Sequence, residues 1–150
     1  MAKKGDEKAI DFPRPLINRD DYNFSFSGLK TSVRYFVEKA EAAGNLPPLD
    51  DIAASFQAAV VDVLVKKTIR AAQEYQVKSI NLTGGVAANS RLRHDLRKAA
   101  DEHNMHVFHP SIKLCTDNAA MIAGIAYQKY QQGQRDELDL NASANSDLGQ

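Results

Sequence analysis

The sequence predicts an α/β fold whose parallel sheet is incomplete. Two apolar segments, at residues 77–82 and 105–109, have the length and composition of buried strands, and a basic amphipathic helix is expected between them. A strand, a helix and a second strand in this order form a βαβ unit, whose strands are parallel by strong preference. Because a parallel sheet usually has about four to six strands, either further strands lie in the first 23 residues or the chain is one part of a larger molecule.

Residues 1–23 are predicted to be an extended arm or linker. They are polar and contain Pro13 and Pro15, neither of which can donate a backbone hydrogen bond. An alternating run at residues 22–26 predicts a short edge strand at the end of this arm.

Two long helices are expected next. Apolar residues recur at helical spacing over residues 29–40, and this first helix is expected to end at Gly44. The second helix follows two consecutive prolines, takes Asp50 or Asp51 as its cap, and runs to about residue 75.

The second half of the chain contains the βαβ unit and a last helix. The helix of the βαβ unit is expected at residues 90–103, and an Ala-rich helix follows the second strand at residues 117–131. The small, polar residues after this helix predict a flexible tail. The expected organisation is therefore an arm at 1–23, one domain at 24–133 and a tail at 134–150.

Composition excludes several classes of protein. With 150 residues and 43% hydrophobic content, the chain is long enough for one domain with its own core. Nineteen basic and nineteen acidic residues leave no net charge, so any surface that binds a polyanion must be local. Cys115 is the single cysteine and is expected to be a packed thiol in a reducing compartment. Without a signal peptide or a long apolar run, we expect a cytoplasmic protein that does not span a membrane.

Gly84 and Gly85 stand between the first expected strand and the helix that follows it. Without Cβ atoms, they would let a phosphate or a ribose approach the backbone and the positive end of that helix. The spacing matches neither the dinucleotide fingerprint nor the P-loop, so a tight turn with a positive φ explains the glycines equally well. Asn89 either caps the helix, which local sequence favours, or points its amide at a nucleotide.

Asp117 is expected at the start of the Ala-rich helix, where free N–H groups and the helix dipole stabilise a carboxylate. Local sequence favours this capping role. The alternative is a metal ligand, because carboxylate oxygen suits divalent cations such as Zn²⁺ or Fe²⁺. One carboxylate cannot form a site alone, and the four histidines include no pair four residues apart on a helix, so all four are expected to be structural or at the surface.

The helix after the glycines carries a group of cationic side chains. Such a face attracts a nucleotide or an RNA backbone, although acidic residues on the same helix partly cancel it, and an ordinary solvated face is favoured for most of them. The group consists of Arg91, Arg93, Arg97 and Lys98.

Three motifs follow one another along the chain. They are Phe24-Ser25-Phe26-Ser27-Gly28-Leu29-Lys30-Thr31, Gly84-Gly85-Val86-Ala87-Ala88-Asn89 and Cys115-Thr116-Asp117-Asn118-Ala119-Ala120-Met121-Ile122-Ala123. In this order they resemble the C-terminal half of the TsaD family, the tRNA N6-adenosine threonylcarbamoyltransferases, formerly labelled Gcp-like O-sialoglycoprotein endopeptidases. The resemblance runs from about residue 5 to residue 132.

This resemblance implies an actin-like ATPase (ribonuclease H-like) fold of two lobes, with this chain as part of the second. It implies an acyltransferase that moves the threonylcarbamoyl group from threonylcarbamoyl-AMP to N6 of adenosine 37 in tRNA. On the matching positions, Asn89 would contact the adenylate, and Gly84 and Gly85 would line its pocket. Asp117 would be a ligand of one divalent metal ion, Fe or Zn. No catalytic residue is assigned.

The family's HxxxH metal motif and its SGGH-type loop do not occur in this sequence. We therefore expect a fragment that lacks the histidine ligands of the metal and is inactive alone. By resemblance, the partners would be tRNA, threonylcarbamoyl-AMP, a paralogous inactive actin-like subunit and a small ATPase. Two alternatives remain: a non-catalytic module that binds a nucleotide or a partner, and another carbamoyltransferase or sugar kinase with the same fold.

Overall fold

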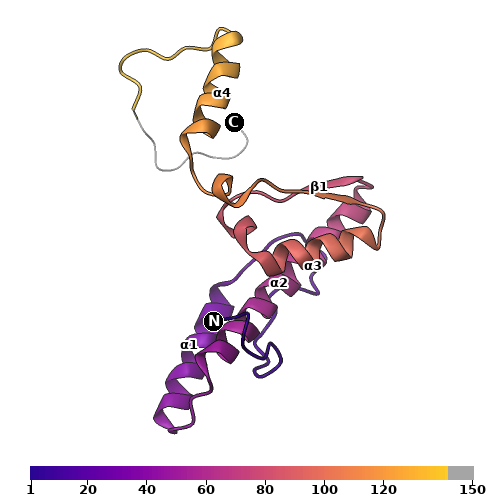
Figure 1. The fold of residues 1–150 in the computed structure, drawn as a ribbon, viewed down its shortest axis with the longest axis vertical. Coiled ribbons are helices and arrows are strands. Elements are labelled where there is room, and N and C mark those ends of the chain that lie inside the picture. Colours follow the sequence, from indigo (N-terminus) through magenta and orange to yellow (C-terminus); the bar gives the residue numbers. More distant parts are fainter. Residues whose placement is uncertain (142–150) are drawn as a thin grey trace. The chain divides into compact units, whose positions relative to one another are not determined.

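The computed structural model describes residues 1–141, which contain four α-helices and one two-stranded sheet (Figure 1). The chain divides into two compact units, Met1–Cys115 and Thr116–Gln150, and each is described by itself. The first unit contains α1 (Ser27–Ala42), α2 (Leu49–Glu74), β1 (Ser79–Asn81), the 3₁₀ helix η1 (Gly85–Ala88), α3 (Ser90–Asp101), β2 (His106–Phe108) and the 3₁₀ helix η2 (Ile112–Leu114). The second contains α4 (Ala119–Gln131). None of the helices within residues 1–141 combines the length and the apolar content that crossing a membrane requires.

The sheet confirms the predicted α/β class and βαβ unit. β1 and β2 are parallel, with Ile80 opposite Val107. These two side chains pack against the core, whereas their neighbours along both strands, Phe108 among them, are exposed. Within residues 1–141 the sheet has two strands, so it is incomplete, as predicted. Both strands are shorter than the predicted ranges of 77–82 and 105–109.

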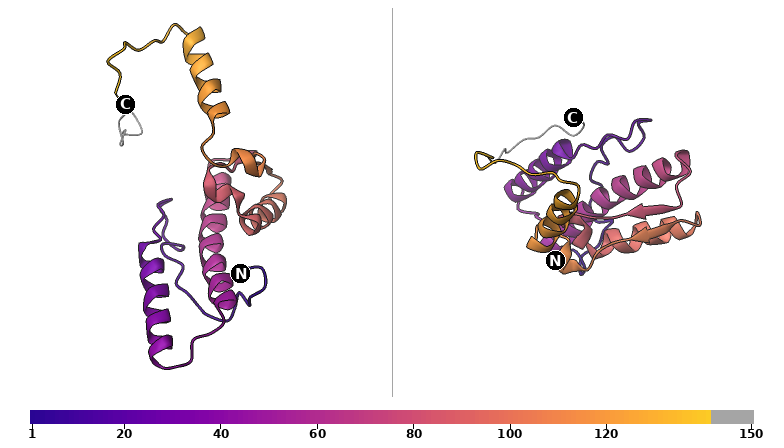
Figure 2. Two further views of the ribbon diagram at one scale, coloured as in Figure 1. Left: turned by 60° about the vertical axis from the view of Figure 1, so that its left-hand side comes forward. Right: turned by 90° about the horizontal axis from the view of Figure 1, so that it is seen from above.

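The long helix α2 joins two hydrophobic clusters (Figure 2). Its N-terminal half packs against α1 and the N-terminal segment in a cluster whose buried members are Phe12, Leu29, Ile52 and Ala59. Its C-terminal half packs against α3 and the sheet in a second cluster, with buried members Ile69, Ala72, Leu96, Ala100 and Met105. The α2 helix is therefore the element that relates the two halves of this unit.

The expected capping of α2 by Asp50 or Asp51 is wrong. The helix begins at Leu49, and no side-chain cap hydrogen bond is formed at Pro48 before it. The Asp51 carboxylate instead accepts a hydrogen bond of 2.8 Å from the backbone N–H of Asp6. Asp50 and Asp51 remain in the first turn, where negative charge is favourable for the helix dipole.

The N-terminal segment lies directly against the first turns of α2. A Cβ on Gly5 would lie 2.0 Å from the carbonyl O of Asp50, so only glycine fits there. Ser55 Oγ donates to the carbonyl O of Asp6 at 3.2 Å and accepts from the N–H of Ile10 at 3.1 Å. The division into an arm at 1–23, a domain at 24–133 and a tail at 134–150 stays a prediction, and residues 142–150 of that tail lie outside the described residues.

The strand predicted at residues 22–26 does not form. Two side chains of α2 donate hydrogen bonds to backbone carbonyl groups just before and within this segment. Lys67 Nζ donates to the carbonyl O of Asp21 at 3.0 Å and of Asn23 at 2.8 Å, and Arg70 donates to the carbonyl O of Asp21 at 2.7 Å. The side chain of Lys67 is only 1% exposed. An alternating pattern without a neighbouring strand is thus overridden by hydrogen bonds to a helix.

Candidate functional site

The turn after β1 is built around Gly84. The hydrogen bonds between β1 and β2 continue one residue beyond the end of β1: the N–H of Leu82 donates to the carbonyl O of Phe108 at 2.8 Å. Gly84 then has φ 83° and ψ 174°, a conformation that is costly for a residue with a Cβ. The interpretation of this glycine as a turn residue with positive φ is confirmed.

Gly85 is not explained in the same way. It begins η1, its φ is not positive, and a Cβ on it would meet no atom within 4 Å. The local fold therefore requires glycine at position 84 but not at position 85. A side chain at position 85 would point into open space.

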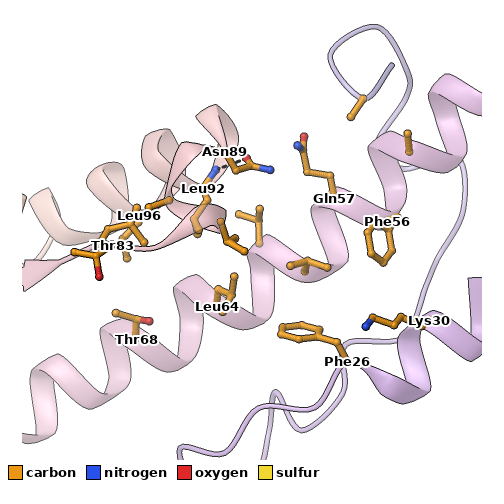
Figure 3. A pocket seen from close by; sticks show the side chains of 17 residues that line it. Phe26, Lys30, Phe56, Gln57, Leu64, Thr68, Thr83, Asn89, Leu92 and Leu96 are labelled. Atoms are coloured by element: carbon orange, nitrogen blue, oxygen red, sulfur yellow. Dashed lines mark hydrogen bonds between the residues drawn. The ribbon is translucent and has the colours of Figure 1, made fainter. Parts of the chain in front are cut away.

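Asn89 caps α3, as local sequence favoured. Its Oδ1 accepts hydrogen bonds from the N–H groups of Arg91 at 3.0 Å and Leu92 at 3.1 Å. These two N–H groups are therefore already used, and η1 separates α3 from the glycines. The expected approach of a phosphate to open N–H groups at the start of this helix is wrong for these two groups. The amide nitrogen of Asn89 points away from the cap, toward Gln57 (Figure 3).

A groove of about 650 Å³ lies between α2, the start of α1 and the junction of η1 with α3 (Figure 3). Its walls are mainly apolar. Small-ligand sites have volumes of this order and combine apolar walls with a few polar groups. The polar side chains here are Lys30, Gln57, Thr68, Thr83 and Asn89. Of the predicted site residues, Asn89 lines the groove, whereas Gly84 and Gly85 lie outside its wall.

Sequence reasoning missed the α2 side of this groove. Gln57, Leu64 and Thr68 are seven and four residues apart, which places them on one face of the helix. The signal that would have found them is a polar residue at each end of an apolar stripe on the helix that precedes the glycine turn.

Arg91 is neutralised by two carboxylates. It forms ion pairs with Glu7 and Asp95, and these hydrogen bonds, that of Glu7 foremost, raise the pKa of its guanidinium. Burial raises the pKa of Asp95, but hydrogen bonds from His94 and Arg91 together with their charges outweigh it, so the pKa lies below its usual range. Arg91 therefore fixes the N-terminal segment to α3 and adds little positive charge to the surface.

Arg93 links η1, α3 and the loop after β2. Its guanidinium donates to the carbonyl O of Ala87 and, at 3.0 Å each, to the carbonyl O of Pro110 and to Cys115 Sγ. Cys115 is 3% exposed, and its Sγ also lies 3.4 Å from the carbonyl O of Ser111. The prediction that this cysteine is a packed thiol is confirmed.

Asp117 lies in the Thr116–Gln150 unit, ahead of α4. The expectation that it caps this helix is wrong: the cap is Asn118, whose Oδ1 accepts from the N–H of Met121 at 3.1 Å. Within residues 1–141, the exposed carboxylate of Asp117 forms neither an ion pair nor a hydrogen bond. The hydrogen-bonded cap at Asp117 is therefore not formed, although its carboxylate stands one residue before the cap, near the positive end of α4. Gly84, Gly85 and Asn89 lie together in the other unit, Met1–Cys115.

The part of the chain that the structure describes contains no group of three or more His, Cys, Asp or Glu side chains that could hold a metal ion. Three of the histidines contact other groups instead: His94 contacts Asp95, His103 contacts Gln73, and His109 contacts Arg97. The described residues do not supply a metal site by themselves.

The fold and the turn define an α/β protein with a ligand-sized groove beside a strand-to-helix turn. Residues 1–124 match the family model of TsaD, described as tRNA N6-adenosine threonylcarbamoyltransferase. The chain belongs to this family, which confirms the resemblance seen in the three motifs.

Curated relatives agree with this assignment. The chain is 49% identical over 145 residues to the tRNA N6-adenosine threonylcarbamoyltransferase of Thermosipho africanus, a match that covers 97% of this chain and 43% of that protein. It is 48% identical, with the same coverage, to the protein of that name from Thermotoga neapolitana. For the Moorella thermoacetica protein the identity is 48% over 142 residues. The chain thus spans less than half the length of these relatives.

Proposed function

We propose that this chain is the adenylate-binding part of a tRNA N6-adenosine threonylcarbamoyltransferase and belongs to the second lobe of an actin-like fold. Family membership supports the reaction class. The observation that carries the adenylate assignment is the Asn89 side chain, whose oxygen caps α3 while its amide nitrogen stays available on the wall of an apolar groove. Gly84 and Gly85 expose the backbone of the same turn. In this role the groove accepts the adenylate of threonylcarbamoyl-AMP, and tRNA is the acceptor.

A chimera tests the reaction. When this chain replaces the matching region of the Thermosipho africanus relative, the product should transfer a radiolabelled threonylcarbamoyl group from threonylcarbamoyl-AMP to tRNA. The unmodified relative is the positive control, and the 150-residue chain alone should show no transfer. A folded chimera without transfer would contradict the proposed function.

Asn89→Ser separates the two roles of Asn89. Serine is also a good N-cap, so α3 should stay folded, but the amide nitrogen is lost. We expect the affinity of the chimera for adenosine monophosphate to fall about two- to tenfold, because one neutral hydrogen bond contributes about 0.5–1.5 kcal/mol. Isothermal titration calorimetry measures this affinity. Asn89→Ala is the matched control, since it also removes the cap and should lower the unfolding free energy by about 1 kcal/mol. Unchanged affinity in Asn89→Ser would exclude Asn89 from the adenylate site.

We also propose that Asp117 supplies one carboxylate ligand to a divalent metal ion, iron or zinc, whose histidine ligands lie outside this chain. Its carboxylate is exposed and forms no hydrogen bond or ion pair with any of residues 1–141, which supports this assignment. When bound, such an ion would act as a Lewis acid toward the donor. Because the described residues lack the remaining ligands, no step of the reaction is derived through it.

The 150-residue chain alone should retain far less than one equivalent of metal. After chelation, reloading with Zn²⁺ or Fe²⁺ and dialysis, mass spectrometry of the metal content should give a sub-stoichiometric value, because one monodentate carboxylate does not hold a mononuclear site. Asp117→Asn should behave like the unchanged chain. One tightly held equivalent that disappears in Asp117→Asn would show that the chain contains a complete site.

The remaining partners follow from the same proposal. A paralogous inactive actin-like subunit and a small ATPase are the expected protein partners, and the cytoplasm is the expected compartment. They are supported by family membership.

A further inference from the structure

We propose that a second groove, beside α3, binds the phosphate backbone of an RNA, an inference that rests on the proposed function. This groove has a volume of about 530 Å³ and lies between α3 and the loop after β2. Cationic groups outnumber acidic ones in its wall, although the chain as a whole has no net charge. The titratable side chains that line it are Arg93, Arg97, Lys98, His94, His109 and Asp101.

The arginines and the lysine of this groove are not neutralised by carboxylates. Arg91, two residues before Arg93 on α3, forms ion pairs with acidic side chains and does not line the groove. By contrast, Arg93, Arg97 and Lys98 form no ion pair with any of residues 1–141. The hydrogen bonds of Arg93 go to backbone carbonyl groups and to Cys115 Sγ rather than to a carboxylate. A groove of this kind attracts a polyanion locally.

The guanidinium of Arg97 is held in place by a histidine rather than by a carboxylate. It donates to Nε2 of His109 at 2.8 Å. The other ring nitrogen of His109, Nδ1, is 3.3 Å from the carbonyl O of Pro110. One edge of the guanidinium is thus fixed while other N–H groups remain for a phosphate. A restrained guanidinium loses less conformational entropy when it binds a phosphate.

The location of the groove favours RNA over an acidic protein. His94, Arg97, Lys98 and Asp101 stand at positions i, i+3, i+4 and i+7 of α3 and share one face, which extends about 10 Å and along which successive phosphates can lie. The groove begins at Ala88 and Ser90, the two neighbours of Asn89. An RNA bound here would therefore lie beside the turn proposed to bind the adenylate, where an acceptor RNA is needed.

Salt-dependent binding tests this surface directly. The probe is a fluorescein-labelled RNA stem-loop, and its anisotropy is followed as the full 150-residue chain is added at several KCl concentrations. Arg97→Gln/Lys98→Gln should weaken binding about tenfold at low salt. The slope of log K against log salt should become shallower by about 1.4 to 1.8, which is the value for two lost phosphate contacts.

Lys8→Gln/Lys39→Gln is the matched control, because it removes the same charge at exposed positions away from this groove. It should change the affinity less than twofold, and both double variants should melt as the unchanged chain does. Equal weakening by the two double variants, no effect of Arg97→Gln/Lys98→Gln, or no binding of RNA at all would each overturn the proposal. Displacement of the RNA by polyglutamate of equal charge would overturn it too, since the surface would then accept acidic protein as well.

A parallel titration with adenosine monophosphate distinguishes this proposal from the proposed function. Arg97→Gln/Lys98→Gln should leave adenylate binding by the chimera unchanged. Loss of RNA binding with intact adenylate binding supports the basic groove as a separate surface. Loss of both would mean that the substitutions disturb the turn, and the proposal would fail. A chimera that binds RNA through this groove but binds no adenylate would contradict the proposed function alone.

Discussion

Replacing Phe12 with alanine should lower the free energy of unfolding by about 3–5 kcal/mol, the largest effect expected from a single substitution here. The side chain of Phe12 is 2% exposed and packs with Leu29, Ile52 and Ala59. Its ring meets that of Phe36 edge to face, with 5.5 Å between the ring centroids. The substitution removes these contacts and leaves a cavity between a non-helical segment and two helices. Urea denaturation followed by far-UV circular dichroism measures the loss.

Tyr35→Ala provides the control for Phe12→Ala. Tyr35 lies on α1 and is 65% exposed, so its removal should change the free energy of unfolding by less than about 0.5 kcal/mol. A loss below about 1 kcal/mol for Phe12→Ala would show that the N-terminal segment does not pack on α1 and α2 in solution.

Lys67→Ala should lower the free energy of unfolding by about 2–3 kcal/mol. Lys67 is 1% exposed, and its ammonium group donates to two backbone carbonyl groups and, at 3.3 Å, to the carboxylate of Asp21. Without it, these acceptors lose a charged donor and residues 21–24 lose their attachment to α2. Thermal and urea unfolding should both report the loss, with the first effect on this segment in amide hydrogen exchange.

Lys66→Ala is the neighbouring control. Lys66 is exposed and makes one hydrogen bond, of 3.0 Å, to Asn18, so the substitution should lower the free energy of unfolding by less than about 0.5 kcal/mol.

The pH dependence of the free energy of unfolding gives a second test of the contact between Lys67 and Asp21. The backbone N–H of Asn23, followed by Lys67, lowers the pKa of Asp21 from its ordinary value of 3.8. The resulting stabilisation is complete above that ordinary value and is lost as the pH falls through the lower folded pKa. Equal losses for Lys66→Ala and Lys67→Ala would contradict the assigned role.

The helices and the βαβ unit were predictable because each depends on local pattern. The apolar spacing over residues 29–40 located α1, and the apolar segments at 77–82 and 105–109 located both strands and their parallel arrangement. The predicted strands were longer than the observed ones, because an apolar residue such as Val77 continues the apolar pattern without pairing with the neighbouring strand.

The contacts of the N-terminal segment were not predictable from such patterns. Phe12 stands beside a proline in a polar stretch and has no periodic neighbours, so its burial depends on a surface formed by distant residues. Lys67 carries a charge, which favours an exposed side chain, yet it is buried because carbonyl groups about 45 residues earlier surround its ammonium group. Long-range contacts of this kind leave no local signal.

In the candidate site, too, some features were predictable from local sequence and others were not. The turn at Gly84 and the cap at Asn89 follow from the conformational freedom of glycine and the hydrogen-bonding capacity of asparagine; the sequence favoured the cap and left the turn as one of two equal alternatives. The capping of α4 was assigned one residue too early, because Asp117 and Asn118 are both good caps and the sequence alone does not select between them. The adenylate and metal roles of Asn89 and Asp117 stay predictions.

The 26 residues of α2 form a rod about 39 Å long. One end is fixed by Phe12 and Leu29, and the other supports Leu96 and the strand that leads to Gly84. Because a helix resists bending over this length, we expect a displacement of the N-terminal segment to shift the other end of α2 and the strand before the glycine turn. The shape of the groove that we propose for the adenylate would thereby be mechanically linked to residues at the opposite end of the unit.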